Sequence, residues 1–291
     1  MRQEKIFELY KGKVKIKFIW DPDNSKTHEY YLVKEDNNKR LCGVTTHIGV
    51  LDKPALIPWA VSVAVDFIRD HMDVLKETDD PDEILKMARA EADKQKDVAA
   101  DIGKAIHTWI ESHIKGEEPD MPEDPKVIQG VNSFLDWVNE NKVTFLWSER
   151  VVYSKKHGYV GTADLGIKIG INGHRGKKYL ADIKTGNGIY AEVKQQTAAY
   201  EKALEEEGDK YDGRWALRIS KDTEEEYLAK QKKKLDAGKI KTIPPYKVFE
   251  ALFLDKDSKS IDRDFKAYLA SIEEYEWKKV AETELKELRT A

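Results

Sequence analysis

The chain has 291 residues, of which 40% are hydrophobic and 36% charged, with a formal net charge of −4 and one cysteine, Cys42. This composition excludes a disordered chain, and the single cysteine excludes an internal disulfide, a multi-cysteine zinc site and a cysteine-held iron–sulfur cluster. No apolar run approaches a membrane span and no apolar secretory segment opens the chain, so we expect an intracellular, cytoplasmic protein, whether cellular or virus-encoded.

The N-terminal part of the chain predicts a β-hairpin followed by helices. Apolar residues alternate over 14–18, the pattern breaks after Asp21 and it resumes over 30–33, which is typical of two paired strands. A proline that the first helical turn tolerates opens a helix over 54–68, and a second helix is predicted over 81–114. We therefore expect a mainly helical region preceded by a hairpin.

The second half of the chain changes from a helical to a strand period. A helix with one buried face is predicted around 131–138. Alternating apolar residues then predict a three-strand meander over 143–153, 163–169 and 178–184. A helix over about 189–207, a strand over 214–219 and a terminal helix around 265–275 follow. This order predicts an α/β (α+β) fold whose central mixed sheet is flanked by helices.

Acidic side chains concentrate on the three predicted central strands. Because side chains alternate along a strand, Asp182 and Lys184 share one face of the third strand. On the second strand Asp164 lies opposite its apolar neighbours, and on the first Glu149 falls in phase with the apolar residues. A buried charge is costly unless it is paired or bound to metal. Three acids beside one lysine leave two net negative charges, which one divalent cation such as Mg²⁺ would neutralise; the alternative for each acid alone is a solvated strand face.

Two predicted helices carry polar side chains on their inward faces. Gln196 and Tyr200 lie on the apolar stripe of the helix after the third strand, where polar groups need partners. Gly103 and His107 stand one turn apart on the long earlier helix, so a ligand that approaches the glycine also meets the imidazole. A satisfied core network is the alternative for Gln196 and Tyr200, and the other histidines are interpreted as structural or surface residues.

Together these residues resemble the ordered motif set of the RecB-type PD-(D/E)XK nucleases. The motifs stand at 103–107, Glu149, 161–164, 182–184 and 196–200. A weaker likeness over 43–59 is similar to phage-type exonucleases and the mitochondrial genome maintenance exonuclease. Ala163 replaces the proline of the family motif, and the lack of cysteines excludes relatives with a cysteine-held cluster, such as the CRISPR adaptation nucleases.

The resemblance implies a restriction-endonuclease-like core over 101–291, with a C-terminal helical extension and an N-terminal hairpin and helical region over 1–100 packed on it. It implies Mg²⁺ or Mn²⁺ as cofactor. The implied ligands are Asp164, Asp182, His107, Glu149 (directly or through water) and the backbone carbonyl of Ile183. Lys184 would orient the attacking water or stabilise the charge on phosphorus, and Gln196 and Tyr200 would position the strand or brace Lys184.

The implied function is a metal-dependent DNA exonuclease in recombination, repair or replication, acting on single-stranded DNA or free ends. The alternatives are an endonuclease on the same core and a catalytically inactive DNA-binding subunit. No phosphate-binding loop of a helicase occurs, so a separate helicase or single-strand-binding protein is a candidate partner. For direct DNA contact the candidates are Lys155, Lys156, the six lysines of 230–241, Trp20, Tyr30, Tyr31 and Trp59, for which solvated loops or core aromatics are the favoured interpretation.

Overall fold

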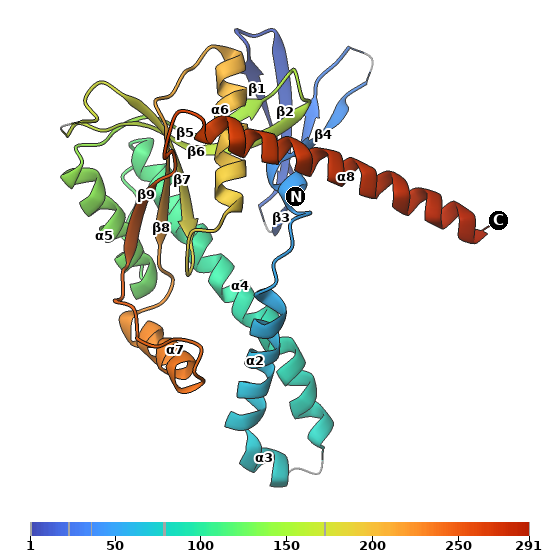
Figure 1. The fold of residues 1–291 in the computed structure, drawn as a ribbon, viewed down its shortest axis with the longest axis vertical. Coiled ribbons are helices and arrows are strands. Elements are labelled where there is room, and N and C mark those ends of the chain that lie inside the picture. Colours follow the sequence, from blue (N-terminus) through green and yellow to red (C-terminus); the bar gives the residue numbers. More distant parts are fainter. Residues whose placement is uncertain (1, 23, 36, 78–79, 172, 291) are drawn as a thin grey trace.

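The computed structural model describes residues 2–22, 24–35, 37–77, 80–171 and 173–290. Within these ranges the chain forms a nine-stranded mixed sheet flanked by helices (Figure 1). The strands are β1 Gln3–Leu9, β2 Val14–Asp21, β3 Asn24–Leu32, β4 Lys39–Gly43, β5 Thr144–Tyr153, β6 Tyr159–Lys168, β7 Lys178–Thr185, β8 Arg214–Ile219 and β9 Phe249–Phe253. This confirms the predicted α/β class with a central mixed sheet.

The helices lie on both faces of the sheet and beyond its edges. They are α1 Val44–Ile48, α2 Leu56–Asp70, α3 Met72–Glu77, α4 Pro81–Ile114, α5 Pro125–Glu140, α6 Glu192–Glu207, α7 Glu224–Asp236 and α8 Ser260–Thr290. The helix predicted over 81–114 is confirmed at both ends, because Pro81 occupies the first turn and the apolar period persists to Ile114. No helix within the described ranges combines the length and apolar character that crossing a membrane requires.

The strand order explains how two sequence-distant regions form one sheet. The order is β1-β2-β3-β4-β6-β7-β8-β9, with β5 paired to β6. The predicted hairpin is β2 and β3, which pair antiparallel with Phe18 opposite Tyr30. Strands β1 and β4, which the sequence did not predict, extend the hairpin to a meander. The parallel pairing of β4 with β6 joins this meander to the strands that carry the acidic residues.

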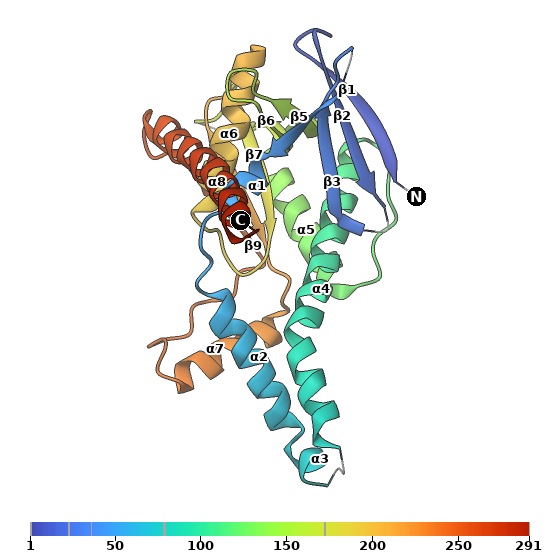
Figure 2. The ribbon, with the colours of Figure 1, turned by 90° about the vertical axis from the view of Figure 1, so that its right-hand side faces the viewer.

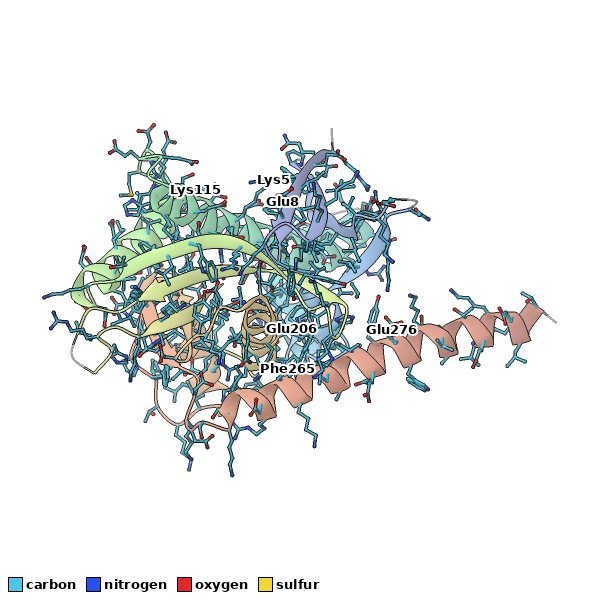
Figure 3. The ribbon with its side chains drawn as sticks, turned by 90° about the horizontal axis from the view of Figure 1, so that it is seen from above. Lys5, Glu8, Lys115, Glu206, Phe265 and Glu276 are labelled. Atoms are coloured by element: carbon cyan, nitrogen blue, oxygen red, sulfur yellow. The ribbon has the colours of Figure 1, made fainter. Side chains whose placement is uncertain are left out.

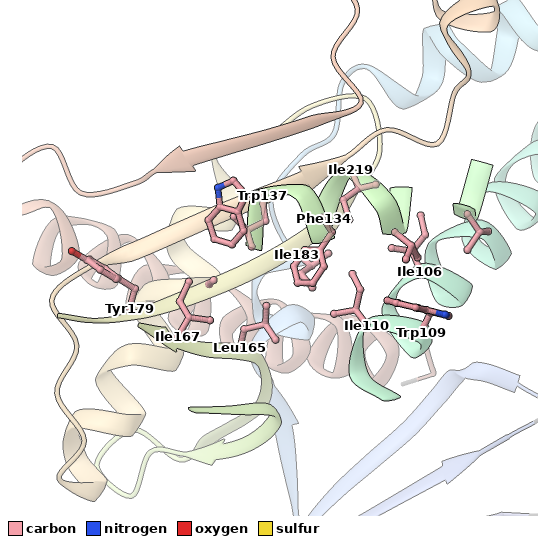
Figure 4. Packing of buried hydrophobic residues seen from close by; sticks show 14 of the residues in the cluster. Ile106, Trp109, Ile110, Phe134, Trp137, Leu165, Ile167, Tyr179, Ile183 and Ile219 are labelled. Carbon is pink, nitrogen blue, oxygen red and sulfur yellow. The ribbon is translucent and has the colours of Figure 1, made fainter. Parts of the chain in front are cut away.

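Alternation along β7 sends successive side chains to two cores. Ala181 and Ile183 belong to a cluster with Phe134 of α5 and Ile110 of α4 (Figure 4). Leu180, in the opposite phase, packs on the other face of the sheet against α6, α8 and α1. Asp182 and Lys184 share the phase of Leu180 and therefore lie toward the α6 side. Each side of β7 is thus covered by helices, which excludes bulk water from most of its length.

Four of the described helices extend away from the sheet over all or part of their length. In Figures 1 and 2, α2, α3 and the first half of α4 form an arm that projects from one end of the molecule. Seen from above, the second half of α8 also extends beyond the sheet, with Phe265 near Glu206 and Glu276 farther along the helix (Figure 3). Its exposed part carries Trp277 and Leu288, with 69% and 74% of their surface accessible.

A buried ionic network fixes α6 and α8 to β8. The Arg214 guanidinium is fully buried and donates to Asp255, to Asp264 Oδ2 at 2.8 Å and to the Lys194 carbonyl at 2.8 Å. Glu201 lies on the same side, with Oε2 3.8 Å from Arg214 Nε. Burial raises the pKa of Glu201 to about 8, although the charge of Arg214 opposes this shift.

Glu201 is expected to make stability pH-dependent. Because its folded-state pKa lies above the ordinary value of 4.5, the protonated acid stabilises the fold at low pH, and this stabilisation is lost as pH rises through about 8. Between pH 4.5 and about 8, the ordinary and the folded-state pKa of Glu201, this group should lower the free energy of unfolding by up to about 1.4 kcal/mol per pH unit. Urea denaturation of wild type and Glu201→Gln at the two ends of the window measures it. An equal pH dependence in both proteins would contradict the assignment.

Candidate functional site

The centre of the candidate site is where β6 and β7 lie side by side. Lys184 Nζ lies 2.6 Å from Asp182 Oδ2, an ion pair between residues on one strand face. The Ile183 amide donates to Asp164 Oδ2 at 2.7 Å. This bond ties Asp164 of β6 to β7, the strand that carries Asp182 and Lys184. The side chain of Ile183 itself is 3% exposed and belongs to the apolar core on the opposite face.

Burial sets the electrostatics of this group. It raises the pKa of Asp182 to about 6, with the Lys184 charge opposing the shift and the Asp164 charge adding to it. Burial also raises the pKa of Asp164. The desolvation of Lys184 favours its neutral form, but the charges of Asp182 and Asp164 outweigh it and leave its pKa raised. The carboxyls are thus destabilised as anions, and a further positive charge would stabilise them.

Glu149 joins these acids from β5, but not through the regular alternation that the sequence predicts. The pairing of β5 with β6 shifts register between Phe145 and Trp147, and the two side chains pack in different clusters. Glu149 therefore does not lie on the apolar face of Phe145, as expected, but beside Asp164 on β6. Its φ is +48°, a left-handed conformation that costs a non-glycine residue of the order of 1 kcal/mol. Burial first, and then Asp164, raise its pKa to about 8.

His107 reaches the same place from α4. Burial lowers its pKa to about 4, and the charge of Lys184 adds to this while that of Asp182 opposes it. One turn earlier, Gly103 packs closely on the end of β7, since a Cβ there would lie 2.5 Å from Thr185 Oγ1. The neutral imidazole is therefore a ligand-competent base next to the acids. The close packing at Gly103 is made by side chains, so the approach of a ligand to this glycine stays a prediction.

Gln196 and Tyr200 line the α6 side of the acids. Gln196 Nε2 donates to the Tyr200 hydroxyl at 3.2 Å, and Tyr200 is 3% exposed. Burial and then the charges of Asp164 and Asp182 raise the pKa of Tyr200, so it stays a neutral hydrogen-bonding group. Gly161 makes the approach of α6 possible, because a Cβ at that position would lie 2.5 Å from the tyrosine ring.

Two contacts near the acids were not predicted from the sequence, which offered Tyr30 only as a candidate for stacking on bases. Tyr30 of β3 shares a 2.8 Å hydrogen bond with Thr162 Oγ1, two residues before Asp164, and burial, with a smaller contribution from Glu149, raises the pKa of Tyr30 to about 12. Lys221, which follows β8, has its Nζ 3.1 Å from the point where a Gly103 Cβ would stand. Burial lowers the pKa of Lys221, and no carboxylate among the described residues pairs with it. Neither residue belongs to a local motif, so only the fold brings them here.

Three of the eight lysines considered for DNA contact have partners within the protein. Lys230 pairs with Asp222 at 2.6 Å and Lys233 with Asp66 at 2.9 Å. Lys155 Nζ lies 3.8 Å from the centre of the Tyr10 ring. These contacts support the interpretation of the lysine-rich segment as ordinary surface charge.

The donor set fits a hard divalent cation. Both Asp182 oxygens are buried, and apart from the Lys184 ion pair at 2.6 Å neither has a side-chain or backbone partner among the described residues. Carboxylate oxygens with a neutral imidazole are ligands that Mg²⁺ or Mn²⁺ accepts. Among the described residues no group of three or more His, Cys, Asp or Glu side chains is already arranged to hold a metal ion. A cation at Asp182 would therefore have to share that carboxylate with Lys184.

Comparison with known proteins adds little to this geometry. No family model matches the chain, and no curated protein matches it. Among the solved structures that match, one titled "Crystal structure of SSO0001" is 14% identical and covers 58% of this chain and 74% of its own, with a TM-score of 0.22. A likeness at that level carries no argument about function.

Proposed function

We propose that the chain is a metal-dependent DNA exonuclease of the PD-(D/E)XK type, which hydrolyses phosphodiester bonds with Mg²⁺ or Mn²⁺. One observation carries the proposal: Asp164, Asp182 and Lys184 meet on the covered face of two neighbouring strands, with Glu149 and His107 beside them. Acids with raised pKa values, two of their oxygens left without hydrogen bonds, are costly to stability. Such strain is typical of a functional site.

In this proposal Asp164 and Asp182 hold the cation, with His107 and Glu149 as further ligands. When bound, the cation supplies Lewis-acid polarisation of the phosphate and a water of lowered pKa. Lys184 stabilises the negative charge that develops on the phosphate oxygens. Lys221 adds a second positive charge beside Gly103, where α4 approaches the site. Gln196 and Tyr200 brace this arrangement from α6.

As the family resemblance implies, the enzyme would act in the recombination, repair or replication of DNA in the cytoplasm. A helicase or a single-strand-binding protein is a candidate partner. An endonuclease on the same core is the second candidate. A DNA-binding subunit without activity is the third, and the buried Asp182 carboxylate counts against it, because its oxygens lack hydrogen bonds and a site that performs no chemistry has no reason to keep groups that destabilise the fold.

The first experiment incubates the purified full chain with end-labelled linear single-stranded DNA, linear duplex DNA and closed circles. Each substrate is tested with Mg²⁺, Mn²⁺ or EDTA. We expect loss of linear DNA with either metal and none in EDTA, because the acids need a cation to act. Cutting of circles would favour the endonuclease, and DNA binding without cleavage under every condition would favour the inactive subunit.

A further inference from the structure

Four aromatic rings form a continuous ladder on one face of the β2–β3 hairpin. Trp20 and His28 are opposite each other in the pairing, as are Phe18 and Tyr30. Phe18 lies in the middle, with ring centroids 5.3 Å from Trp20 in a stacked pair, 5.7 Å from His28 and 4.9 Å from Tyr30. We call these four residues the aromatic ladder.

The ladder runs from the core into solvent. Tyr30 is 6% exposed and belongs to the cluster that joins the meander to β5 and β6. Phe18 and Trp20 are half-buried, and His28 is exposed. A buried ring at one end anchors the others, while their outer edges and faces remain available. Half-exposed rings in mutual contact form a surface on which further planar groups can stack.

The two faces of the hairpin differ in charge. On the outer face the lysines are neutralised, Lys17 by Glu4 at 3.2 Å and Lys15 by Glu8 at 3.0 Å. Lys5 is opposite Phe18 in the β1–β2 pairing and so shares the ladder's face. It is exposed and has no carboxylate partner among the described residues. The aromatic face therefore offers an unneutralised cation beside its rings.

The buried end of the ladder leads directly to the acids. The Tyr30 hydroxyl is bonded to Thr162 at 2.8 Å, and Thr162 precedes Asp164 by two residues on the same face of β6. The hydrogen bond from Tyr30 to Thr162 thus ties the ladder to the strand that carries Asp164.

From this continuity we infer that the aromatic ladder is a stacking platform for the bases of single-stranded DNA, with Lys5 facing its phosphates, and that it feeds the strand to the acids. Rings interleaved with a cation recognise unpaired bases, whereas a duplex hides its base faces. The choice of DNA as the ligand rests on the proposed nuclease function, but the binding itself does not depend on cleavage.

The test compares wild type with Trp20→Leu, which keeps an apolar side chain but removes the ring. Tyr31→Leu is the matched control, since Tyr31 is an aromatic residue of the same hairpin in the opposite phase, bonded to Glu29. Binding of fluorescein-labelled oligothymidine is followed by anisotropy in EDTA, which prevents metal-dependent cleavage. A strand of abasic residues with the same phosphates serves as the second probe. Circular dichroism establishes that each variant is folded.

We expect Trp20→Leu to raise the Kd for oligothymidine about fivefold or more, the effect of one lost stacked base, and to leave the Kd for the abasic strand unchanged. Tyr31→Leu should bind both as wild type does. Equal binding of oligothymidine by wild type and a folded Trp20→Leu, or no binding by wild type, would overturn the platform. If binding depends on Trp20 but no metal supports cleavage, the nuclease proposal fails and the platform stands.

Discussion

Replacing Lys184 with alanine is expected to lower the rate of DNA hydrolysis by about 100- to 1000-fold, the usual effect of removing one group that stabilises transition-state charge. The protein should stay folded. Without the ammonium 2.6 Å away, Asp182, whose pKa is already about 6, takes up a proton near neutral pH instead of remaining a buried anion. Rates of release of end label in Mg²⁺ and in Mn²⁺ measure the effect.

Lys168→Ala is the matched control for this variant. Lys168 lies at the exposed end of β6, four residues after Asp164, so its loss changes the net charge equally without touching the acids. We expect it to cleave DNA as wild type does. If Lys184→Ala cleaves at the wild-type rate, Lys184 has no part in the reaction and the PD-(D/E)XK assignment is wrong.

The sequence was most informative where one period persists over many residues. The 34-residue helix α4 and the strands β5 to β7 follow their hydrophobic periods closely, and each was predicted. Strand β1 was missed because its alternate residues are mostly charged and exposed, and it is held only by pairing with β2. β4 and β9 have only five residues each, too few for a period to be recognised.

The same contrast holds within the candidate site. Alternation alone placed Asp182 and Lys184 side by side, and helical spacing placed Gln196 next to Tyr200. Alternation failed for Glu149, because the register shift between Phe145 and Trp147 and the left-handed φ of Glu149 interrupt the regular period of β5. Alternation could not predict the contact of Tyr30 with Thr162, because the two residues are 132 positions apart in the chain. Contacts of that kind arise from strand order, which local patterns do not encode.

Arg214 shows how such distant contacts position the site. It is fully buried at the start of β8, and its partners lie on α6, on the segment after β9 and on α8. Among them, the carbonyl of Lys194 belongs to the first turns of α6, the helix that carries Gln196 and Tyr200. The guanidinium therefore holds α6 in the place from which it covers the acids.

Arg214→Met is expected to destabilise the protein by about 3–5 kcal/mol, because it leaves Asp255 and Asp264 without the buried cation that they share. Urea denaturation measures the loss. Arg214→Lys, which keeps the charge but not the forked donors, should recover only part of it, since a single ammonium nitrogen cannot take the separate positions from which the guanidinium nitrogens bond Asp255, Asp264 and the Lys194 carbonyl. Unchanged stability in Arg214→Met would mean that α6 is held by its apolar face alone. If both variants lose stability but a folded fraction of Arg214→Lys cleaves DNA at the wild-type rate per folded molecule, Arg214 acts on stability and not on the geometry of the site.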